Sequence, residues 1–234
     1  MMEVVLSRAR TVAENLAMDE SVARNAWATG TYLLRFWWGG PPAVVMGSNE
    51  CPEQVADVAE CMRYGVSLLK RCSGGGTVLQ TKDVLNYSLI TPAPAALDVG
   101  ASFCQGTDLI RAILTSFSIT GIPQGTSDVA VGDRKISGNA QAWRWKSLLV
   151  HGTLLVDFDF DLAEKLLKHP PREPDYRRGR NHRDFLVTLR ALGVRASRGE
   201  IETAAILAAE RIFGSVKPHH TLPSSYPPSA AILS

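Results

Sequence analysis

The stretch Lys70-Arg71-Cys72-Ser73-Gly74-Gly75-Gly76-Thr77-Val78-Leu79 combines a basic pair, a hydroxyl, three successive glycines and an apolar run. The pattern predicts a strand, a tight turn and a second strand. Because three glycines remove every Cβ from one wall of the turn, a ligand can lie directly against backbone N–H groups. Arg71 brings a fixed positive fork to the same place. A glycine-rich hairpin turn without a ligand is the alternative, since such signatures are weak in isolation.

Strands are expected on both sides of this turn. Val66 to Leu69 leads into the glycines, and the alternating pattern of Val84 to Ile90 predicts the partner strand, so that the turn sits inside a sheet. Earlier in the chain, the aromatic and β-branched runs Tyr32 to Trp38 and Ala43 to Met46 are separated by Gly39-Gly40-Pro41-Pro42. This punctuation predicts a hairpin.

Helices are predicted where apolar residues recur at helical spacing. Thr11 can cap a first helix whose buried face carries Val12, Leu16, Ala23 and Trp27. The other predicted helices span about Pro52 to Tyr64, Leu109 to Phe117, Leu162 to Leu167 and Ile201 to Ile212, the last closed by Gly214.

The second half of the chain returns to strands. Three runs between Asp128 and Asp157, with a turn at Gly132-Asp133, predict an antiparallel meander. Strand pairs and helices alternate without regular βαβ units, which argues against a doubly wound parallel sheet. The predicted fold class is α+β, with a largely antiparallel sheet flanked by helices. Residues 1–214 are expected to form one domain and residues 215–234 a flexible tail, with no C-terminal accessory domain.

Composition narrows the classes of function. The 234 residues carry a net charge of +2, so no strong field favours nucleic acid or a membrane surface as partner. No leader peptide or membrane-spanning segment is recognisable. The cysteines lack the close spacing of a zinc site or a redox dithiol; they are Cys51, Cys61, Cys72 and Cys104. A cytoplasmic protein with reduced thiols is expected.

A second informative segment runs from Ser127 to Gln141. Lys135 lies one residue into a predicted strand, and its small neighbours Gly138 and Ala140 leave space for the ammonium to reach a ligand. A compact cation suits negative charge that develops on a carboxylate or phosphate oxygen. Asp128 could hold a metal ion or orient Lys135. The alternative is a surface lysine that follows a hairpin turn.

These segments together resemble the motifs of the lipoate-protein ligase family. In chain order the motifs are Arg71-x-Ser73-Gly74-Gly75-Gly76-x-Val78, Asn86-Tyr87-Ser88, Asp128, Lys135-Ile136-Ser137-Gly138-Asn139-Ala140-Gln141 and His151-Gly152-Thr153-Leu154-Leu155. Asn15-Leu16-Ala17-Met18-Asp19-Glu20 and Val44-Val45-Met46-Gly47 resemble the first-helix and second-strand motifs of the same family. The order and the approximate spacing match from about Asn15 to Gly214.

The resemblance implies a fold similar to the catalytic domain shared by biotin ligases and class II aminoacyl-tRNA synthetases. It also implies a two-step reaction that uses ATP, lipoate and Mg²⁺. Lipoate attacks the α-phosphorus of ATP to give lipoyl-AMP and pyrophosphate, and the ε-amine of a lysine on an acceptor protein then attacks the mixed anhydride. The implied partner is a lipoyl-acceptor protein, such as a lipoyl domain or an H-protein-like chain.

On this resemblance Lys135 is the catalytic residue, in contact with both the carboxylate and the α-phosphate. Arg71 would neutralise phosphate charge, and Asp128 would assist a metal ion or the lysine. His151 is either a ligand contact or a core histidine. The residues expected to bind ATP or lipoyl-AMP are Arg71, Ser73, Gly74, Gly75, Gly76, Thr77, Val78, Leu79, Asn86, Asp128, Lys135, Gly138, Ala140 and His151.

The sequence departs from the family pattern in three places. Lys70 replaces the first of two arginines, which keeps the charge but not the bidentate geometry. The link from Gln80 to Asn86 is longer than in many members and lacks their histidine. After Gly214 only a short tail is expected, so either a separate accessory-domain protein completes the enzyme or this form works without one.

The main alternative is an octanoyl or lipoyl transferase that works through a cysteine thioester. Cysteine-dependent relatives carry the thiol shortly before the lysine motif, where this chain has Gly125-Thr126-Ser127-Asp128. A biotin ligase is disfavoured because its Gly-Arg-Gly-Arg type of loop is missing. A catalytically silent lipoate-binding protein is disfavoured because Arg71 and Lys135 are both present.

The basic run from Arg172 to Arg183 is either a solvated loop or a docking surface for an acidic acceptor, and its few aromatic residues disfavour RNA as the partner.

Overall fold

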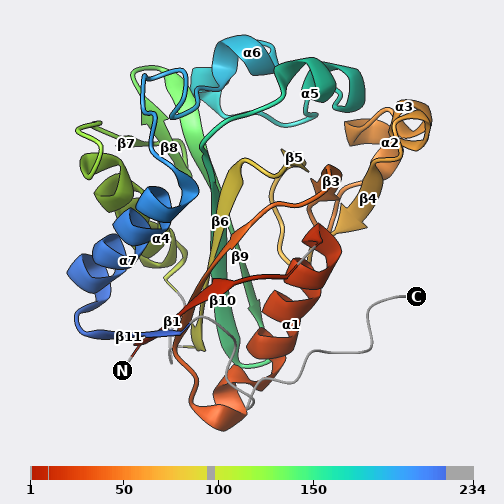
Figure 1. Cartoon of the computed structure of the whole chain (residues 1–234). Coiled ribbons are helices and arrows are strands. Elements are labelled where there is room, and N and C mark those ends of the chain that lie inside the picture. Colours follow the sequence, from red (N-terminus) through yellow and green to blue (C-terminus); the bar gives the residue numbers. More distant parts are fainter. Residues whose placement is uncertain (1, 10, 94–97, 220–234) are drawn as a thin grey trace.

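The computed structural model describes residues 2–9, 11–93 and 98–219, which form two sheets and the helices around them (Figure 1). The strands are β1 (Met2–Ser7), β2 (Leu33–Trp38), β3 (Ala43–Met46), β4 (Ser67–Lys70), β5 (Val78–Gln80), β6 (Val84–Pro92), β7 (Ile122–Gln124), β8 (Asp128–Val131), β9 (Arg134–Arg144), β10 (Ser147–Leu155) and β11 (Val216–His219). The helices are α1 (Val12–Thr29), α2 (Pro52–Val55), α3 (Val58–Arg63), α4 (Val99–Thr115), α5 (Phe160–Leu166), α6 (His182–Phe185) and α7 (Arg198–Phe213), with a 3₁₀ turn, η1, at Asp175–Arg177.

The larger sheet has eight strands in the order β11-β1-β2-β6-β10-β9-β8-β7. Strand β1 runs parallel to both of its neighbours, and every other pair in this sheet is antiparallel. The predicted meander is confirmed as β8, β9 and β10, and Gly132 takes a φ of +62° in the first of its turns. The α+β class with a largely antiparallel sheet is therefore confirmed.

The smaller sheet, of order β4-β3-β5, overturns two pairings expected from the sequence. Strand β3 lies between β4 and β5, so the predicted hairpin of β2 and β3 does not form. Strand β6 does not pair with the strands that flank the glycines, because it lies between β2 and β10 in the larger sheet. The physical reason is burial: β2 is buried along its whole length and β6 along most of it, and such strands need a covered, central position.

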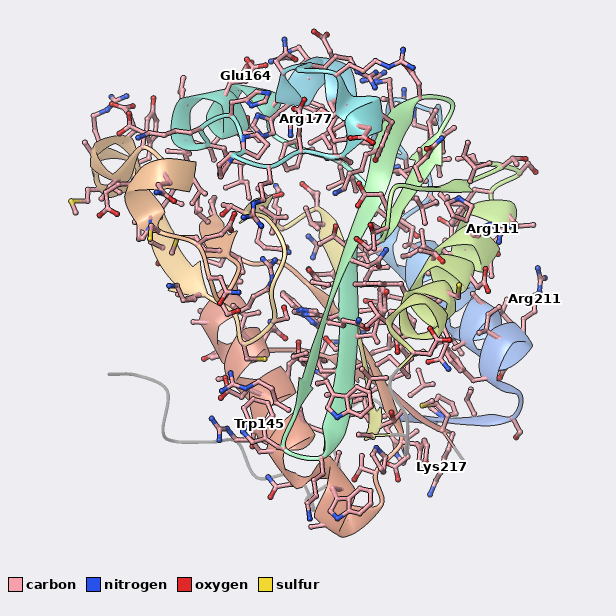
Figure 2. The ribbon with its side chains drawn as sticks, turned by 180° about the vertical axis from the view of Figure 1, so that it is seen from behind. Arg111, Trp145, Glu164, Arg177, Arg211 and Lys217 are labelled. Carbon is pink, nitrogen blue, oxygen red and sulfur yellow. The ribbon has the colours of Figure 1, made fainter. Side chains whose placement is uncertain are left out.

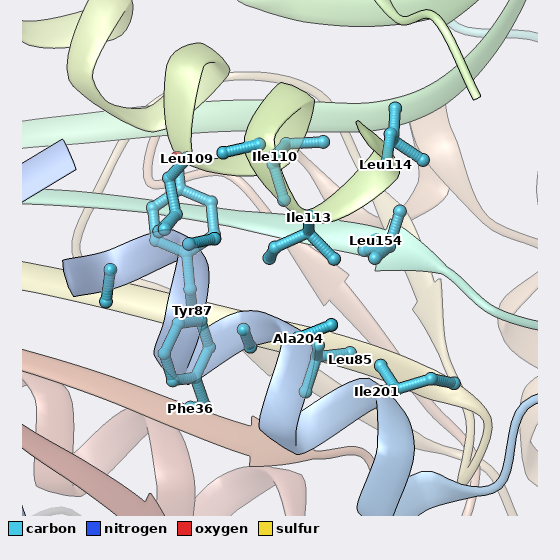
Figure 3. Close-up of a cluster of buried hydrophobic side chains, with 14 of the residues drawn as sticks. Phe36, Leu85, Tyr87, Leu109, Ile110, Ile113, Leu114, Leu154, Ile201 and Ala204 are labelled. Atoms are coloured by element: carbon cyan, nitrogen blue, oxygen red, sulfur yellow. The ribbon is translucent and has the colours of Figure 1, made fainter. Parts of the chain in front are cut away.

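Helices cover both faces of the larger sheet (Figure 1). Helices α4 and α7 pack together on one face, where Phe36, Tyr87, Leu109 and Ile113 belong to the main hydrophobic core (Figure 3). Helix α1 packs on the other face against β6 and β10. None of the described helices has both the length and the apolar content needed to cross a membrane.

Helix α1 begins as predicted at Thr11, whose side chain forms a capping box with Glu14. Its predicted apolar face is only partly correct, because Trp27 is 52% exposed. The face that α1 turns to the sheet instead includes two buried polar residues, Asn15 and Asp19. A pattern of apolar residues could not identify Asn15 and Asp19, because these polar side chains are buried as hydrogen-bond partners of the charged Arg35.

The predicted helix from Pro52 to Tyr64 is wrong in its continuity. Ala56 is extended, with a φ of −138°, and forms a bridge with Leu167. This pairing divides the segment into α2 and α3. The link between them is thereby tied to the chain that follows α5.

The predicted C-terminal tail begins too early. Helix α7 ends at Gly214 as expected, but Val216–His219 forms β11, which pairs in parallel with β1 at the edge of the larger sheet. The rest of the predicted tail, residues 220–234, lies outside the described residues.

Candidate active site

A cavity of about 420 Å³ lies between the two sheets. It is bounded by residues 71–77, called the glycine loop here, by the hairpin of β8 and β9, and by residues 168–186, called the covering segment. The predicted ligand-binding residues in its lining are Arg71, Gly75, Gly76, Thr77, Val78, Leu79, Asn86, Asp128, Lys135, Gly138, Ala140 and His151. Ser73 and Gly74 are not in the lining and contribute hydrogen bonds to residues that are. The structure thus gathers the predicted residues from five strands around one space.

The guanidinium of Arg71 lies inside the glycine loop. It donates to Ser73 Oγ at 3.0 Å, to the carbonyl of Val45 at 3.3 Å, and to the carbonyls of Gly74 and Gly76 at 2.6 and 2.8 Å. Burial lowers the pKa of Arg71 to about 10, which leaves it charged at neutral pH. Four hydrogen bonds commit this side chain to the shape of the loop. In this structure the Arg71 guanidinium therefore bonds mainly to the loop itself, whereas the sequence predicted that it would face a phosphate.

The glycine loop packs closely against the chain that follows β3, through contacts of Gly47, Gly75 and Glu50. A Cβ on Gly47 would lie 2.0 Å from the carbonyl oxygen of Gly75, and Gly75 itself takes a φ of +87°. Both positions therefore require glycine. Glu50 accepts from the N–H of Gly47 at 2.9 Å and from the hydroxyl of Thr77 at 2.6 Å. The sequence prediction missed Glu50, which also lines the cavity.

His151 contacts the glycine loop from β10. Its Nε2 lies 2.6 Å from Ser73 Oγ. Burial, with a smaller contribution from Arg71, lowers the pKa of His151 to about 3, so the imidazole is neutral at physiological pH. The amides of Asn86 and Gln80, which also line the cavity, bond reciprocally at 2.7 and 3.0 Å. These two residues and His151 therefore contribute neutral polar groups to the lining.

The ammonium of Lys135 is the compact cation of the site. Its Nζ lies 2.8 Å from Asp128 Oδ1, across the β8 and β9 pair. A Cβ on Gly138 would lie only 2.5 Å from the same Nζ and 2.7 Å from Cε. The missing Cβ of Gly138 therefore leaves room for the lysine side chain, and the predicted reach of the ammonium to a ligand stays a prediction. The alternative of a surface lysine fails, because the side chain is 25% exposed and faces the cavity.

The covering segment contributes residues that the sequence analysis assigned to a solvated or docking loop. The members of this segment that line the cavity include Arg172, Glu173, Pro174, Arg177, His182, Phe185 and Leu186. Arg177 is only 5% exposed, and burial lowers its pKa. Figure 2 shows Arg177 at the end of the molecule opposite Trp145, which marks the turn between β9 and β10. The available sequence signal was the presence of two aromatic residues, Tyr176 inside the basic run and Phe185 just after it. In the structure they pack together with ring centroids 5.1 Å apart.

A buried ionic network supports the strands beneath the site. Arg35 on β2 bonds to Asp19 and to Asn15, both on α1. Asp19 Oδ2 also accepts from Ser88 Oγ on β6 at 2.6 Å. Burial raises the pKa of Asp19, and the attraction of Arg35 opposes this shift. The first-helix motif therefore fixes α1 to the centre of the larger sheet.

Both carboxylate oxygens of Asp128, the predicted metal ligand, have partners in this structure. Lys135 takes Oδ1, and the hydroxyl of Tyr176 donates to Oδ2 at 2.8 Å. Within the part of the chain that the structure describes, no three His, Cys, Asp or Glu side chains are grouped so as to hold a metal ion. Mg²⁺ needs several oxygen ligands in near-octahedral geometry. The described side chains do not by themselves form such a site.

The cysteines lie away from the cavity lining. Cys51 and Cys104 are exposed, Cys61 is buried in the core, and Cys72 faces a separate cavity of about 180 Å³ between α1, β4 and β10. Burial raises the pKa of Cys72 to about 11, so its thiol is protonated at neutral pH. A thioester mechanism needs an activated thiolate at the reacting centre. None of the four cysteines meets that requirement in this structure.

Residues 11–208 match the family model described as the lipoyl protein ligase A/B catalytic domain, and the chain therefore belongs to this family. Among similar proteins, lipoate–protein ligase 1 of Staphylococcus aureus is 32% identical over 67% of this chain and 47% of its own. The octanoyltransferase LipM of Carboxydothermus hydrogenoformans is 28% identical over 67% of this chain and 65% of its own. The chain spans about half the length of the first curated ligases it matches.

Solved structures share the fold. A bi-partite lipoate protein ligase of Thermoplasma acidophilum, described with its E2 lipoyl domain, aligns with a TM-score of 0.83 at 23% identity, covering 97% of this chain and 89% of that one. A lipoate-protein ligase A bound with ATP aligns with a TM-score of 0.83 at 21% identity, covering 96% and 90%. At these identities the alignments establish the common fold.

Proposed function

We propose that this chain is an ATP-dependent lipoate-protein ligase. The observation that carries the proposal is the single cavity on which the ammonium of Lys135 and the glycine loop converge. In the first step a carboxylate oxygen of lipoate attacks the α-phosphorus of ATP, and pyrophosphate leaves. In the second step the ε-amine of an acceptor lysine attacks the acyl carbon, and AMP and a proton leave.

The residues around the cavity supply binding and charge stabilisation for this reaction. Lys135 stabilises the negative charge that grows on the non-bridging oxygens of the α-phosphate. The glycine loop, whose shape Arg71 maintains, lets the acyl-nucleotide approach the backbone closely. Arg177 brings a second buried positive charge from the covering segment, which suits the pyrophosphate part of the nucleotide. Positioning the two reactants side by side supplies much of the rate.

The partners follow from the same proposal. The acceptor is a lipoyl domain or an H-protein-like chain. The exposed Arg172 and Arg178 provide positive charge that would attract an acidic acceptor. A separate accessory-domain protein is proposed by analogy with the bi-partite ligase of Thermoplasma acidophilum. Mg²⁺ is proposed to enter as the counterion of the nucleotide phosphates, since Asp128 is committed to Lys135 and Tyr176.

Intact-mass measurement of an acceptor lipoyl domain tests the proposed function. With this chain, lipoate and ATP present, the acceptor should gain the mass of one lipoyl group, and it should not when ATP is omitted. A parallel reaction supplies synthetic lipoyl-AMP in place of lipoate and ATP, which tests the transfer step alone. An acceptor whose mass stays unchanged in both reactions would contradict the proposal.

A methyl group at position 138 is expected to lower the rate of lipoyl-AMP formation by about 10- to 100-fold, through misplacement of the reacting groups. In Gly138→Ala the new Cβ displaces Nζ of Lys135, the flexible end of a side chain, so the fold should persist. Lipoate-dependent exchange of ATP and pyrophosphate measures the loss. Gly199→Ala is the matched control, because a Cβ there meets open space. Equal exchange rates in the two variants would show that the lysine does not need this space.

A further inference from the structure

Tyr176 contacts the Lys135 end of the candidate active site through the Asp128 carboxylate. Its hydroxyl donates to Asp128 Oδ2 at 2.8 Å, and the other oxygen of that carboxylate, Oδ1, lies 2.8 Å from Lys135 Nζ. Asp128 and Lys135 line the cavity, whereas Tyr176 is not among the lining residues. One carboxylate is therefore shared between the cation of the site and a hydroxyl from the covering segment.

The covering segment is attached to the hairpin that carries Lys135 at further points. Arg180 donates to the Asp133 side chain at 2.9 Å and to the Asp133 carbonyl at 2.8 Å, in the turn between β8 and β9. Leu186 forms a parallel bridge with Lys135, and the N–H of Val187 donates to the Lys135 carbonyl at 2.8 Å. These contacts link the segment, and the residue that follows it, to the hairpin turn and to the start of β9.

The ring of Tyr176 also links the hydroxyl to residues that face the cavity. It packs against Phe185 with centroids 5.1 Å apart, and the guanidinium of Arg177 lies 4.9 Å from the Phe185 ring centre. Phe185 and Arg177 both line the cavity. When these side chains are seated over the cavity, Tyr176 is held beside Asp128.

A lysine ammonium on its flexible stem has no preferred direction of its own. A carboxylate fixed on one oxygen by a second donor can hold the ammonium in one orientation, as partners behind a catalytic group do in other sites. Burial and the charge of Asp128 raise the pKa of Tyr176, so its hydroxyl keeps the proton that it donates.

We propose that Tyr176 is a positioning residue that ties the seating of the covering segment to the orientation of Lys135. The Tyr176 hydroxyl holds the Asp128 carboxylate, and the carboxylate in turn holds the Lys135 ammonium at the cavity. This inference rests on the proposed ligase function for its catalytic consequence, while the orientation of Lys135 can be measured without any activity.

Tyr176→Phe tests the inference, because it keeps the ring against Phe185 and removes only the hydroxyl. In lipoate-dependent exchange of ATP and pyrophosphate, kcat should fall about 10- to 100-fold, while KM for ATP and for lipoate changes by less than about 3-fold. Tyr32→Phe is the matched control, since Tyr32 is 48% exposed and lies outside the cavity lining. The thermal midpoint of both variants should equal that of the parent chain.

A second measurement follows Lys135 directly. An amine-directed acylating reagent is added to the protein without nucleotide, and peptide mass spectrometry gives the labelling rate of Lys135 relative to Lys146 in the same sample. Loss of the hydroxyl should raise this ratio several-fold in Tyr176→Phe and leave it unchanged in Tyr32→Phe.

Unchanged kcat together with an unchanged labelling ratio would overturn the inference. A fall in kcat that only tracks a lower thermal midpoint, with the labelling ratio unchanged, would also overturn it, because Tyr176 would then be a structural residue. If the parent chain alone shows no exchange, it does not activate lipoate without a further protein, and the labelling ratio alone decides the positioning role.

Discussion

Lys135→Ala is expected to reduce lipoate-dependent exchange of ATP and pyrophosphate by about 1,000-fold, the upper range for loss of one preorganised donor at an oxyanion. β9 carries this ammonium at the cavity, and Gly138 leaves the space it occupies; under the proposed function the ammonium stabilises charge on the α-phosphate. The backbone of β9 and its pairing with β8 and β10 do not depend on this side chain. The thermal midpoint should therefore stay within a few degrees of the parent value.

Lys146→Ala is the control for the lysine substitution. Lys146 lies in the turn between β9 and β10, and its ammonium approaches Trp27 at 5.8 Å from the ring centre, away from the cavity lining. Exchange activity should equal that of the parent chain. Full exchange activity in Lys135→Ala would refute the assigned catalytic role.

Asp19→Ala is expected to lower the free energy of unfolding by about 3–5 kcal/mol, the usual cost of removing one partner from a buried ion pair. The substitution leaves the Arg35 guanidinium buried without its opposite charge, and Ser88 loses the acceptor of its hydroxyl. Both Arg35 and Ser88 lie on central strands of the larger sheet. Urea unfolding followed by fluorescence measures the change.

An exposed ion pair provides the comparison. Asp108 and Arg111 pair on α4 at 2.8 Å with both side chains nearly half exposed, so Asp108→Ala should cost less than about 1 kcal/mol. Replacing both buried partners with apolar residues, as in D19L with R35M, should recover much of the loss. A cost below 1 kcal/mol for Asp19→Ala would mean that Arg35 finds solvent or another acceptor.

The motif residues Lys135, Gly138 and Ala140 all lie on β9 and line the cavity. Lys135 and Gly138 are three positions apart, so a regular strand would turn them to opposite faces, and the register shift of β9 against β8 between these positions brings both to the cavity. The match of the glycine stretch and the lysine segment to one family also predicted that they face one ligand, and the cavity brings them together.

The failures occurred where partners are distant in sequence. Glu50 meets Thr77 across 27 positions, and Tyr176 meets Asp128 across 48, so no local pattern contains either pair. The pairing of β3 with β5 and of β6 with β2 likewise depended on which strands could be buried on both faces. Arg177 was assigned to a solvated or docking loop because its neighbours are basic, yet it is buried against Phe185.

The sequence by itself determined the α+β class, the family and the residues that supply charge and space at the site. Periodicity, glycine positions and motif order are properties of the sequence, and they can be interpreted without knowledge of long-range contacts. Only the tertiary structure decided that Arg71 shapes the glycine loop, that Asp128 is shared between Lys135 and Tyr176, and that the covering segment lines the cavity. These features depend on which buried polar groups find partners across the fold, because a buried donor or acceptor left unpaired is costly.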